Sequence, residues 1–312
     1  AGDLRLSKGS EIITAAQTSR QILVWTDQSL YSMQFLGPPF TFGVSMLADN
    51  IRIAGPNAAI AVNDVVFWMG QENFYLYDGR IQVIPCTVRD YVFSDMNNQQ
   101  SFKFHAGSIG SQTEIWWFYC SSGATVVDRC VTFNYVESSP QRPVWTTSTL
   151  DRTTWVDSSV FGKPHATDYD ASSNNSYDVV GNTDGCTIYY EHETGTDQVT
   201  TTATTAITSN IESGDFDISQ GGDGEFFAKI RRFIPDFVSQ TGNTQITLQL
   251  RNYSNDAQAS SALGPFTISS STTKVDTRAR ARAVSLKVAN TASQQNWKLG
   301  GFRLDIQPDG RR

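Results

Sequence analysis

The feature that most constrains the fold of this chain is a recurring pattern of short apolar runs separated by polar turns. Residues 21–35 and 65–85 each read as strands joined by tight turns, and the Asp78-Gly79 pair between apolar runs is a strong hairpin signal. Apolar residues do not recur at three- and four-residue spacing over any long window, so few helices are expected. The pattern predicts an all-β protein.

A loose internal repeat accompanies these runs. Trp25, Trp68 and Trp116 lie 43 and 48 residues apart, each inside an apolar strand before a polar turn. A four-stranded propeller blade takes roughly 40–50 residues, and a radial array of blades leaves only short, protected edges. The repeat therefore predicts a β-propeller. Because it carries no W-D or kelch signature, an irregular stack of meanders or a sandwich is the alternative.

The pattern continues along the chain and then changes. Residues 114–135 are expected to form a third unit that closes with strands at 143–145 and 154–156, and residues 186–191 to open a fourth. The Thr-rich stretch 199–208 reads as a linker or an extended crossing strand.

Beyond that stretch the apolar residues alternate strictly with polar ones, as at 246–250 and 302–306, which is typical of strands with one buried face. We therefore predict propeller blades over residues 1–205, followed by a small C-terminal β-sandwich or platform domain over residues 206–312.

The composition limits the classes of protein to which the chain can belong. Its 312 residues suffice for two domains. Only 18% of them are charged and the net charge is −7, which argues against general affinity for nucleic-acid phosphates but is compatible with a local basic patch. No run of about 18 apolar residues occurs, so no membrane-spanning segment is expected. The start, Ala1-Gly2-Asp3, is not a signal peptide, and we expect a fragment or processed product of a longer protein.

Motifs for catalysis are missing. His105, His165 and His192 are scattered and show no zinc-type spacing, so we expect them to be solvent-facing or capped. The nucleophile elbow, the phosphate-binding loop and the dinucleotide-binding motif are absent. We therefore predict no enzymatic activity and no cofactor.

An oxygen-rich stretch and the cysteines each have a simple structural explanation. The stretch Asp168-x-Asp170-x-Ser172-x-Asn174 has the alternating oxygen side chains that calcium prefers, but it lacks the glycine and glutamate of an EF-hand, and a solvated turn explains it more simply. The cysteines at 86, 120, 130 and 186 form no C-x-x-C pair, so we expect mostly buried thiols. A disulfide between Cys120 and Cys130 across a hairpin is the less favoured reading.

The most informative charge pattern is Arg278-Ala-Arg280-Ala-Arg282. Period-two spacing places the three guanidinium groups on one face of a strand, and the same parity continues into the apolar residues of 284–288. The arginines are thus expected at the overhanging end of one strand, at a domain or subunit boundary. There they would bind carboxylates of a neighbouring subunit, or phosphate, or simply be solvated. Asp215 and Asp217 are a candidate acidic counterpart.

Several segments together resemble the tail nozzle proteins, also called tail tubular or tail hub proteins, of short-tailed bacteriophages. The segments are Lys8–Glu11 followed by ILVWTDQSLYSMQF, Asn50–Asn57 followed by VVFWMGQENFYLYDGR, Tyr190–Gly195, Trp297–Gly300 and Arg303–Arg312. The resemblance covers most of the chain as short β motifs and includes no catalytic signature.

The resemblance implies a propeller joined to β-rich platform domains in a structural virion protein. It implies a homo-oligomeric ring, typically of six copies, below the portal and adaptor complex of the tail, assembled in the host cytoplasm. The ring would conduct genomic DNA without sequence-specific binding and would dock tail fibres or spikes. Members of this family are usually longer, so the first blades would lie upstream of Ala1 and the propeller would be incomplete here.

Two other functions compete with this one. A glycan-binding or glycan-cleaving propeller of a phage host-recognition protein would stack sugars on exposed rings such as Trp145 or Trp155, although both fit a blade core better. A solitary bacterial surface or scaffold propeller would instead be a monomer that binds a peptide.

Overall fold

The computed structural model describes residues 3–157, 162–170, 186–193, 195, 197–199, 204–218, 226–253, 256 and 262–311. Strands make up 56% of the described residues and helices 6%, which confirms the all-β class. The chain divides into two compact units, unit 1 (residues 1–194) and unit 2 (residues 195–312). The predicted domain boundary, between residues 205 and 206, falls inside a strand of unit 2 (Thr204–Ala206).

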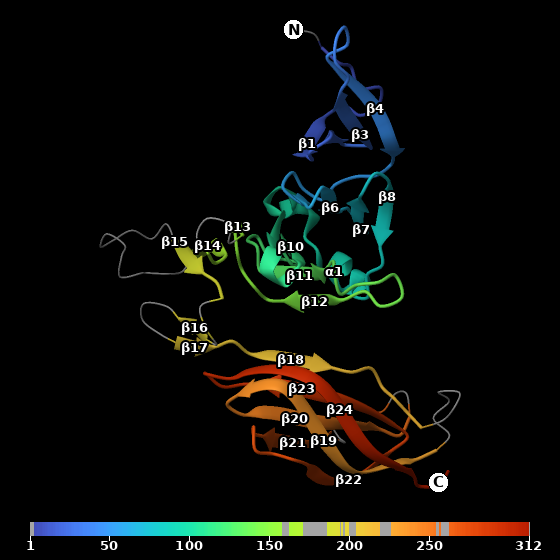
Figure 1. Cartoon of the computed structure of the whole chain (residues 1–312), viewed down its shortest axis with the longest axis vertical. Coiled ribbons are helices and arrows are strands. Elements are labelled where there is room, and N and C mark those ends of the chain that lie inside the picture. Colours follow the sequence, from blue (N-terminus) through green and yellow to red (C-terminus); the bar gives the residue numbers. More distant parts are fainter. Residues whose placement is uncertain are drawn as a thin grey trace. The chain divides into compact units, whose positions relative to one another are not determined.

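Unit 1 contains four successive antiparallel sheets in its described part, and strands that follow one another in sequence are neighbours in each sheet (Figure 1). The first sheet is β1 (Ile12–Gln17), β2 (Ile22–Thr26), β3 (Ser29–Phe35) and β4 (Phe42–Asp49); the second is β5 (Ala59–Val62), β6 (Val65–Met69), β7 (Phe74–Tyr77) and β8 (Ile81–Ile84); the third is β9 (His105–Ile109), β10 (Glu114–Tyr119), β11 (Arg129–Asn134) and β12 (Trp145–Ser148); the fourth is β13 (Thr154–Val156), β14 (His165–Asp170) and β15 (Cys186–Glu191). The hairpins predicted within residues 21–35 and 65–85 are confirmed.

The first strands of successive sheets lie side by side. β1 contacts β5, β5 contacts β9, and β9 contacts β13. Just before β5, Asn57 forms a parallel bridge with His105 at the start of β9, and the Asn57 carbonyl accepts a hydrogen bond from the Ala106 N–H at 2.8 Å. The sheets of unit 1 are therefore joined to one another through their first strands.

Each of the first three sheets buries one tryptophan at the same place. Trp25, Trp68 and Trp117 are the fourth residues of β2, β6 and β10, and all three are fully buried. The sequence repeat assigned Trp116 as its third member, but the equivalent residue in the structure is the next one, Trp117. Successive side chains of a strand point to opposite faces, so only one of two adjacent tryptophans enters the core, and Trp116 instead stacks on Trp155.

The assignment of two late strands also differs from the prediction. Residues 154–156 do not close the third sheet but begin the fourth, because β13 pairs with β14 through Thr154 and Thr167. Residues 186–191 form the third strand of that fourth sheet and not its first. The sequence offered no turn signal that would separate these two sheets.

Short helices occur between strands and were not predicted. They are α1 (Arg89–Asp95), η1 (Asn98–Lys103) and η2 (Gly110–Gln112). α1 buries only Val92, so it has no periodic apolar stripe that a sequence pattern could show. The Asn97 side chain accepts a hydrogen bond from the Gln99 N–H and caps η1.

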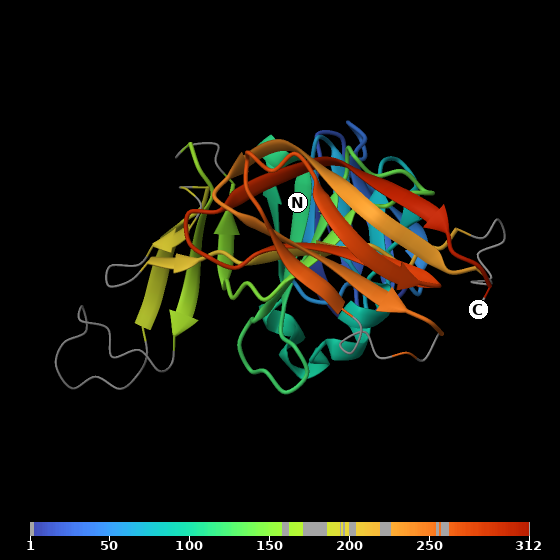
Figure 2. The same ribbon diagram turned by 90° about the horizontal axis from the view of Figure 1, so that it is seen from below.

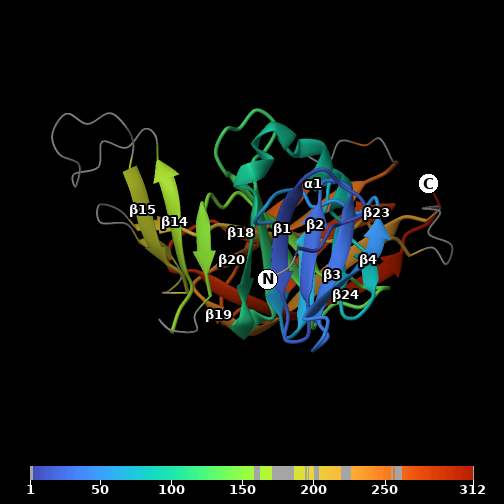
Figure 3. The same cartoon turned by 90° about the horizontal axis from the view of Figure 1, so that it is seen from above.

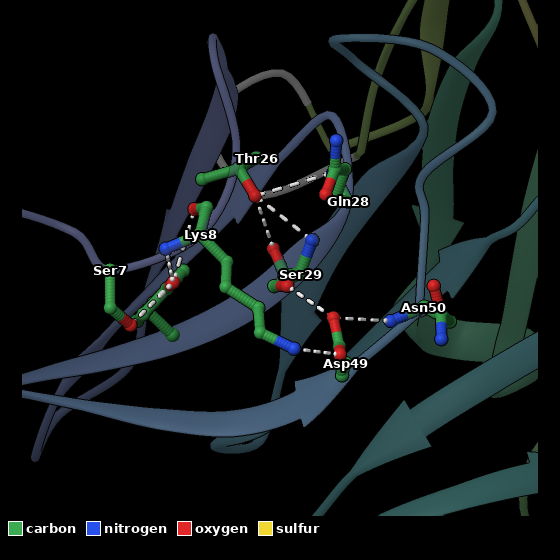
Figure 4. A network of polar contacts seen from close by, with 8 residues as sticks. Ser7, Lys8, Thr26, Gln28, Ser29, Asp49 and Asn50 are labelled. Atoms are coloured by element: carbon green, nitrogen blue, oxygen red, sulfur yellow. Dashed lines mark hydrogen bonds and ion pairs between the residues drawn. The ribbon is translucent and has the colours of Figure 1, made fainter.

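A polar clip, drawn in Figure 4, fastens the segment before β1 to the first sheet, which Figure 3 shows from above. The Lys8 N–H donates to the Tyr31 hydroxyl at 2.7 Å, and that hydroxyl donates back to the Lys8 carbonyl at 3.1 Å. The Lys8 ammonium pairs with Asp49, whose carboxylate also accepts a hydrogen bond from the Ser29 hydroxyl at 2.8 Å. These bonds hold the pKa of Asp49 below its usual value.

Unit 2 begins with a hairpin and continues with two antiparallel sheets. The hairpin is β16 (Asp197–Val199) and β17 (Thr204–Ala206); one sheet has the order β18 (Ser209–Glu212), β23 (Ala283–Asn290), β20 (Thr244–Arg251) and β21 (Ala262–Ile268); the other has the order β22 (Val275–Ala281), β19 (Ala228–Thr241) and β24 (Asn296–Pro308). The described ends of the Thr-rich stretch thus pair in a hairpin, which corrects the expectation of a linker or crossing strand.

The two sheets of unit 2, drawn mainly in orange to red in Figure 2, share one hydrophobic core. β19 contributes Ile230 and Phe233, and β20 contributes Ile246 and Leu248, all of which are fully buried. The Phe233 ring meets Phe266 of β21 edge to face, with ring centroids 5.5 Å apart. The alternation predicted for residues 246–250 is confirmed at these positions.

Candidate interface site in the C-terminal unit

The arginines at 278, 280 and 282 lie where one sheet of unit 2 passes into the other. Arg278 and Arg280 are exposed on β22 and alternate with the buried Ala279 and Ala281, as period two predicts. Arg282 stands in the break between β22 and β23. The expectation that all three arginines and residues 284–288 share one strand is therefore wrong.

The buried positions explain this break. On β22 the buried residues carry odd numbers, whereas on β23 Val284 and Val288 are buried. A chain that passes between two sheets that share one core changes the side that it turns to that core, and bends are usual at such places. The Arg282 N–H donates to the Arg251 carbonyl of β20 at 3.1 Å and so already belongs to the second sheet.

Two of the arginines are held on an aromatic ring. The guanidinium carbons of Arg280 and Arg282 lie 3.9 Å and 4.7 Å from the centroid of the Phe227 ring. The Arg280 Nε pairs with the Asp309 carboxylate at 2.5 Å, and the Arg282 Nη2 donates to the Arg311 carbonyl at 3.1 Å. Sequence analysis missed Phe227, because nothing in the pattern distinguishes it from a core phenylalanine.

Further cations surround Arg280 on the same sheet. Lys229 of β19 is its register partner on the neighbouring strand, so both side chains project from the same exposed face. Arg231, also exposed, lies at the irregularity in the β19–β22 pairing. No described residue forms an ion pair with Lys229, Arg231 or Arg278. We call Lys229, Arg231, Arg278 and Arg280 the basic cluster.

The predicted acidic counterpart lies in the same chain and close by. Phe216 bridges Val284 through two backbone hydrogen bonds of 2.9 Å and 3.0 Å, which places Asp215 and Asp217 beside the start of β23. Asp215 forms an ion pair with Arg251 at 2.9 Å. The structure thus brings the acidic tract to the arginine-bearing end of unit 2 within one chain. A role for either group at a subunit boundary stays a prediction.

Charge is divided unequally between the two units. Unit 1 has 11 Lys and Arg against 20 Asp and Glu, a net charge of −9, whereas unit 2 has 13 against 11, a net charge of +2. The basic cluster therefore belongs to the less acidic unit of an acidic protein. Because exposed charges act over about a Debye length of 10 Å at 0.1 M salt, this cluster can select an anionic surface.

The two tryptophans considered as sugar platforms are packed in unit 1. The Trp145 ring lies 4.7 Å from both Phe74 and Phe133, and its indole N–H donates to a carbonyl at 2.8 Å. The Trp155 ring stacks on Trp116 at 5.2 Å, and its indole N–H donates to the Ser108 carbonyl at 2.9 Å. The core reading favoured for both rings agrees with this packing.

Of the two alternatives expected for the histidines, solvent-facing or capped, the hydrogen bonds of His105 and His192 agree with the second. His105 is buried and stacks on Phe118, and His165 lies beside Tyr189. His192 accepts a hydrogen bond from the Nε of the buried Arg152 at 3.1 Å. Burial, reinforced by the Arg152 charge, lowers the pKa of His192 to about 4, so the ring is neutral at neutral pH. Its Nε2 lone pair accepts the hydrogen bond from Arg152 and is therefore not available to act as a general base.

The other sequence features resolve as follows. Cys86, Cys120 and Cys130 are free thiols, the latter two buried, while the side chain of Cys186 lies outside the described residues. Asp168 and Asp170 belong to strand β14, and the remainder of the calcium-like stretch lies outside the described residues. Among the described residues there is no cluster of three or more metal-ligating side chains. No helix in the described part of the chain is long and apolar enough to span a membrane.

Comparison with known proteins gives no family assignment. No model of a known protein family matches the chain, and no curated protein matches it significantly.

Proposed function

We propose that this protein is a structural component of a virus particle, a tail nozzle or hub subunit of a short-tailed bacteriophage that assembles into a homo-oligomeric ring. The resemblance described above suggests this role. The structure supports it through the folded position of one resembling motif: the Lys8–Glu11 segment fastens onto the sheet formed by the segment that follows it.

The fold proposed for this function is an incomplete propeller followed by a sandwich. Successive meander sheets whose first strands lie side by side are the arrangement of propeller blades around an axis. Two sheets that share one core are the arrangement of a β-sandwich. Both arrangements suit a structural role, because they leave few exposed strand edges.

The observation that carries the proposal is the basic cluster of unit 2 in a chain whose unit 1 has a net charge of −9. A ring needs two different surfaces on each copy that fit each other head to tail. Opposite charges on the two units provide such a pair, with Lys229, Arg231 and Arg278 available for carboxylates of the next copy. An acidic wall would also let genomic DNA pass without holding its phosphates.

In this proposal about six copies ring the tail axis below the portal and adaptor complex, and the outside of the ring docks fibres or spikes. The protein would be found in the virion tail after assembly in the host cytoplasm. It performs no bond chemistry; its activity is assembly and conduction of the genome.

The test is the mass of the native assembly. Native mass spectrometry of the full chain, or cryo-electron microscopy of the particles that contain it, is expected to show a closed ring of several copies around an axial channel. The Arg278→Glu variant should dissociate the ring at lower salt than the wild type, whereas Lys298→Glu, the same charge change on an exposed residue of β24, should not. A wild-type chain that stays monomeric, and is absent from the tail axis, would overturn the proposal.

A further inference from the structure

The hairpin between β3 and β4 exposes a compact group of large apolar side chains. Phe35, Leu36 and Phe40 are 67%, 60% and 71% exposed, and Phe42 is 44% exposed. The Phe35 and Phe42 rings meet edge to face with centroids 5.7 Å apart. We call these four residues the apolar tip.

Contacts within the chain itself hold the conformation of the apolar tip. Its loop is closed by a hydrogen bond from the Leu36 N–H to the Thr41 carbonyl at 3.1 Å. The Leu36 side chain packs so closely on Gly43 that a Cβ there would lie 2.6 Å from it. No charged residue occurs anywhere from Gln28 to Ala48. A preorganised, charge-free apolar projection of this kind marks a contact surface, because leaving such rings in water is unfavourable.

An apolar cleft of about 470 Å³ lies elsewhere on unit 1, between the second and third sheets. Phe67 of β6, Leu76 of β7 and Phe133 of β11 line it, with the exposed Val83 at one side. This volume is within the range of about 300–1,000 Å³ in which proteins hold apolar groups. We call it the β6–β11 cleft.

The tip does not occupy the cleft of its own chain, because its side chains are exposed. Two copies of unit 1, each with a net charge of −9, repel each other, so a contact between them is favoured at surfaces without charge. The tip has no charge, and Asp78 is the charged residue that borders the cleft. The same negative charge opposes approach to an anionic bilayer, which is the other surface that an apolar projection could enter.

We propose that the apolar tip of one copy seats in the β6–β11 cleft of the next copy. This inference rests on the proposed ring. It identifies the contact between unit 1 of one copy and unit 1 of the next copy. The contact is heterologous, because tip and cleft are different surfaces of the same chain, and its repetition builds a ring when the rotation between successive copies closes.

The available area makes the tip an anchor and not the whole interface. At about 150–250 Å² for a buried aromatic side chain, the exposed parts of Phe35, Phe40 and Phe42 amount to roughly 300–450 Å². A stable interface needs about 800 Å² on each partner. The basic cluster of unit 2 is the second surface that contributes to the remainder.

Cross-linking between two differently tagged chains tests the pairing of these surfaces. In a background with Cys86→Ser and Cys186→Ser, one chain carries Phe40→Cys and the other Val83→Cys, and a short bis-maleimide is added. Cross-linked pairs are expected from the mixture of the two chains and not from Phe40→Cys alone. The control is Phe102→Cys, at a residue of η1 that is 60% exposed and does not line the cleft, mixed with Val83→Cys.

A second variant tests the contact between tip and cleft separately from the formation of the ring. Phe40→Asp should raise the concentration needed for half-assembly by about tenfold or more, whereas Phe102→Asp should leave it unchanged. A wild-type ring with no tip–cleft cross-link and no effect of Phe40→Asp overturns the inference and leaves the proposed function standing. A wild-type monomer overturns both. Self-cross-linking of Phe40→Cys, or flotation of the wild type but not Phe40→Asp with phosphatidylcholine vesicles, also overturns the choice of partner.

Discussion

Lys229 and Arg280 are register partners on adjacent antiparallel strands, and both project from the exposed face of one sheet. Like charges in directly opposed positions destabilise a sheet by about 0.2–1 kcal/mol. The pair of Arg280 with Asp309 offsets part of this cost and leaves Lys229 without a described ion-pair partner. We therefore expect Lys229→Glu to stabilise unit 2 by up to about 1 kcal/mol in chemical denaturation while it weakens assembly.

The comparison for that prediction is Lys298→Glu on the same sheet. Lys298 faces Ser239 across the β19–β24 pairing, so its reversal relieves no like-charge contact. If Lys229→Glu and Lys298→Glu shift the denaturation midpoint equally, the cross-strand repulsion is not the cause.

Unit 1 should lose stability as the pH falls from 6.5 towards 4. The folded pKa of His192 is about 4 against an ordinary value of 6.5, so the unfolded chain binds more protons in this window. The contribution of His192 to the free energy of unfolding is complete above pH 6.5 and is lost as the pH falls through the folded pKa. With allowance for partial exposure of the ring, it amounts to about 1–2 kcal/mol. The pKa of His105, lowered by burial, acts in the same direction.

Thermal unfolding of the full chain at several pH values measures this effect. The matched variant is His192→Gln, which offers Arg152 an acceptor oxygen and does not titrate. Its unfolding temperature should vary less between pH 6.5 and 4 than that of the wild type. Equal pH dependence in both proteins would show that His192 is not the group responsible.

The polar clip depends on the backbone of Gly9. This residue has φ +95°, and a Cβ there would lie 2.5 Å from the Thr26 hydroxyl oxygen. Gly9→Ala should therefore destabilise the first sheet by about 1–3 kcal/mol. Gly37→Ala, at φ +79° with open space around it, carries the backbone cost alone and should be milder. Denaturation followed by tryptophan fluorescence distinguishes the two variants.

The equivalent tryptophans of successive sheets should differ in their response to loss of the indole N–H. Trp117 donates to the Ala58 carbonyl at 3.2 Å, whereas the indole N–H groups of Trp25 and Trp68 are buried without a hydrogen-bond partner. The Ala58 carbonyl keeps the hydrogen bond from the Met69 N–H at 3.1 Å. Trp117→Phe therefore removes one of its two hydrogen bonds and should cost about 0.5–1.5 kcal/mol more than Trp68→Phe. Equal losses in the free energy of unfolding would contradict this reasoning.

The hairpins of the first three sheets were predictable, because alternation and turn residues are local properties. The choice between Trp116 and Trp117 was not, since both continue the apolar run and only pairing with neighbouring strands decides which one faces the core. The same limit applies to residues 154–156, whose sheet is set by Thr167 on another strand.

Only part of the candidate site could be predicted from the sequence. Alternation correctly places Arg278 and Arg280 on an exposed face. The alternation did not predict the break at Arg282, because a regular alternation of Arg and Ala contains no turn signal. Nor could it reveal that Phe227 lies beneath two guanidinium groups or that Asp215 pairs with Arg251, since these contacts join distant segments.

The passage of the chain from one layer to the other at Arg282 has a mechanical consequence. β22 and β23 are consecutive in sequence but belong to different sheets, so a load applied to the exposed arginines of β22 passes along the main chain directly into the second sheet. A protein pulled at this corner would resist shear with both sheets at once.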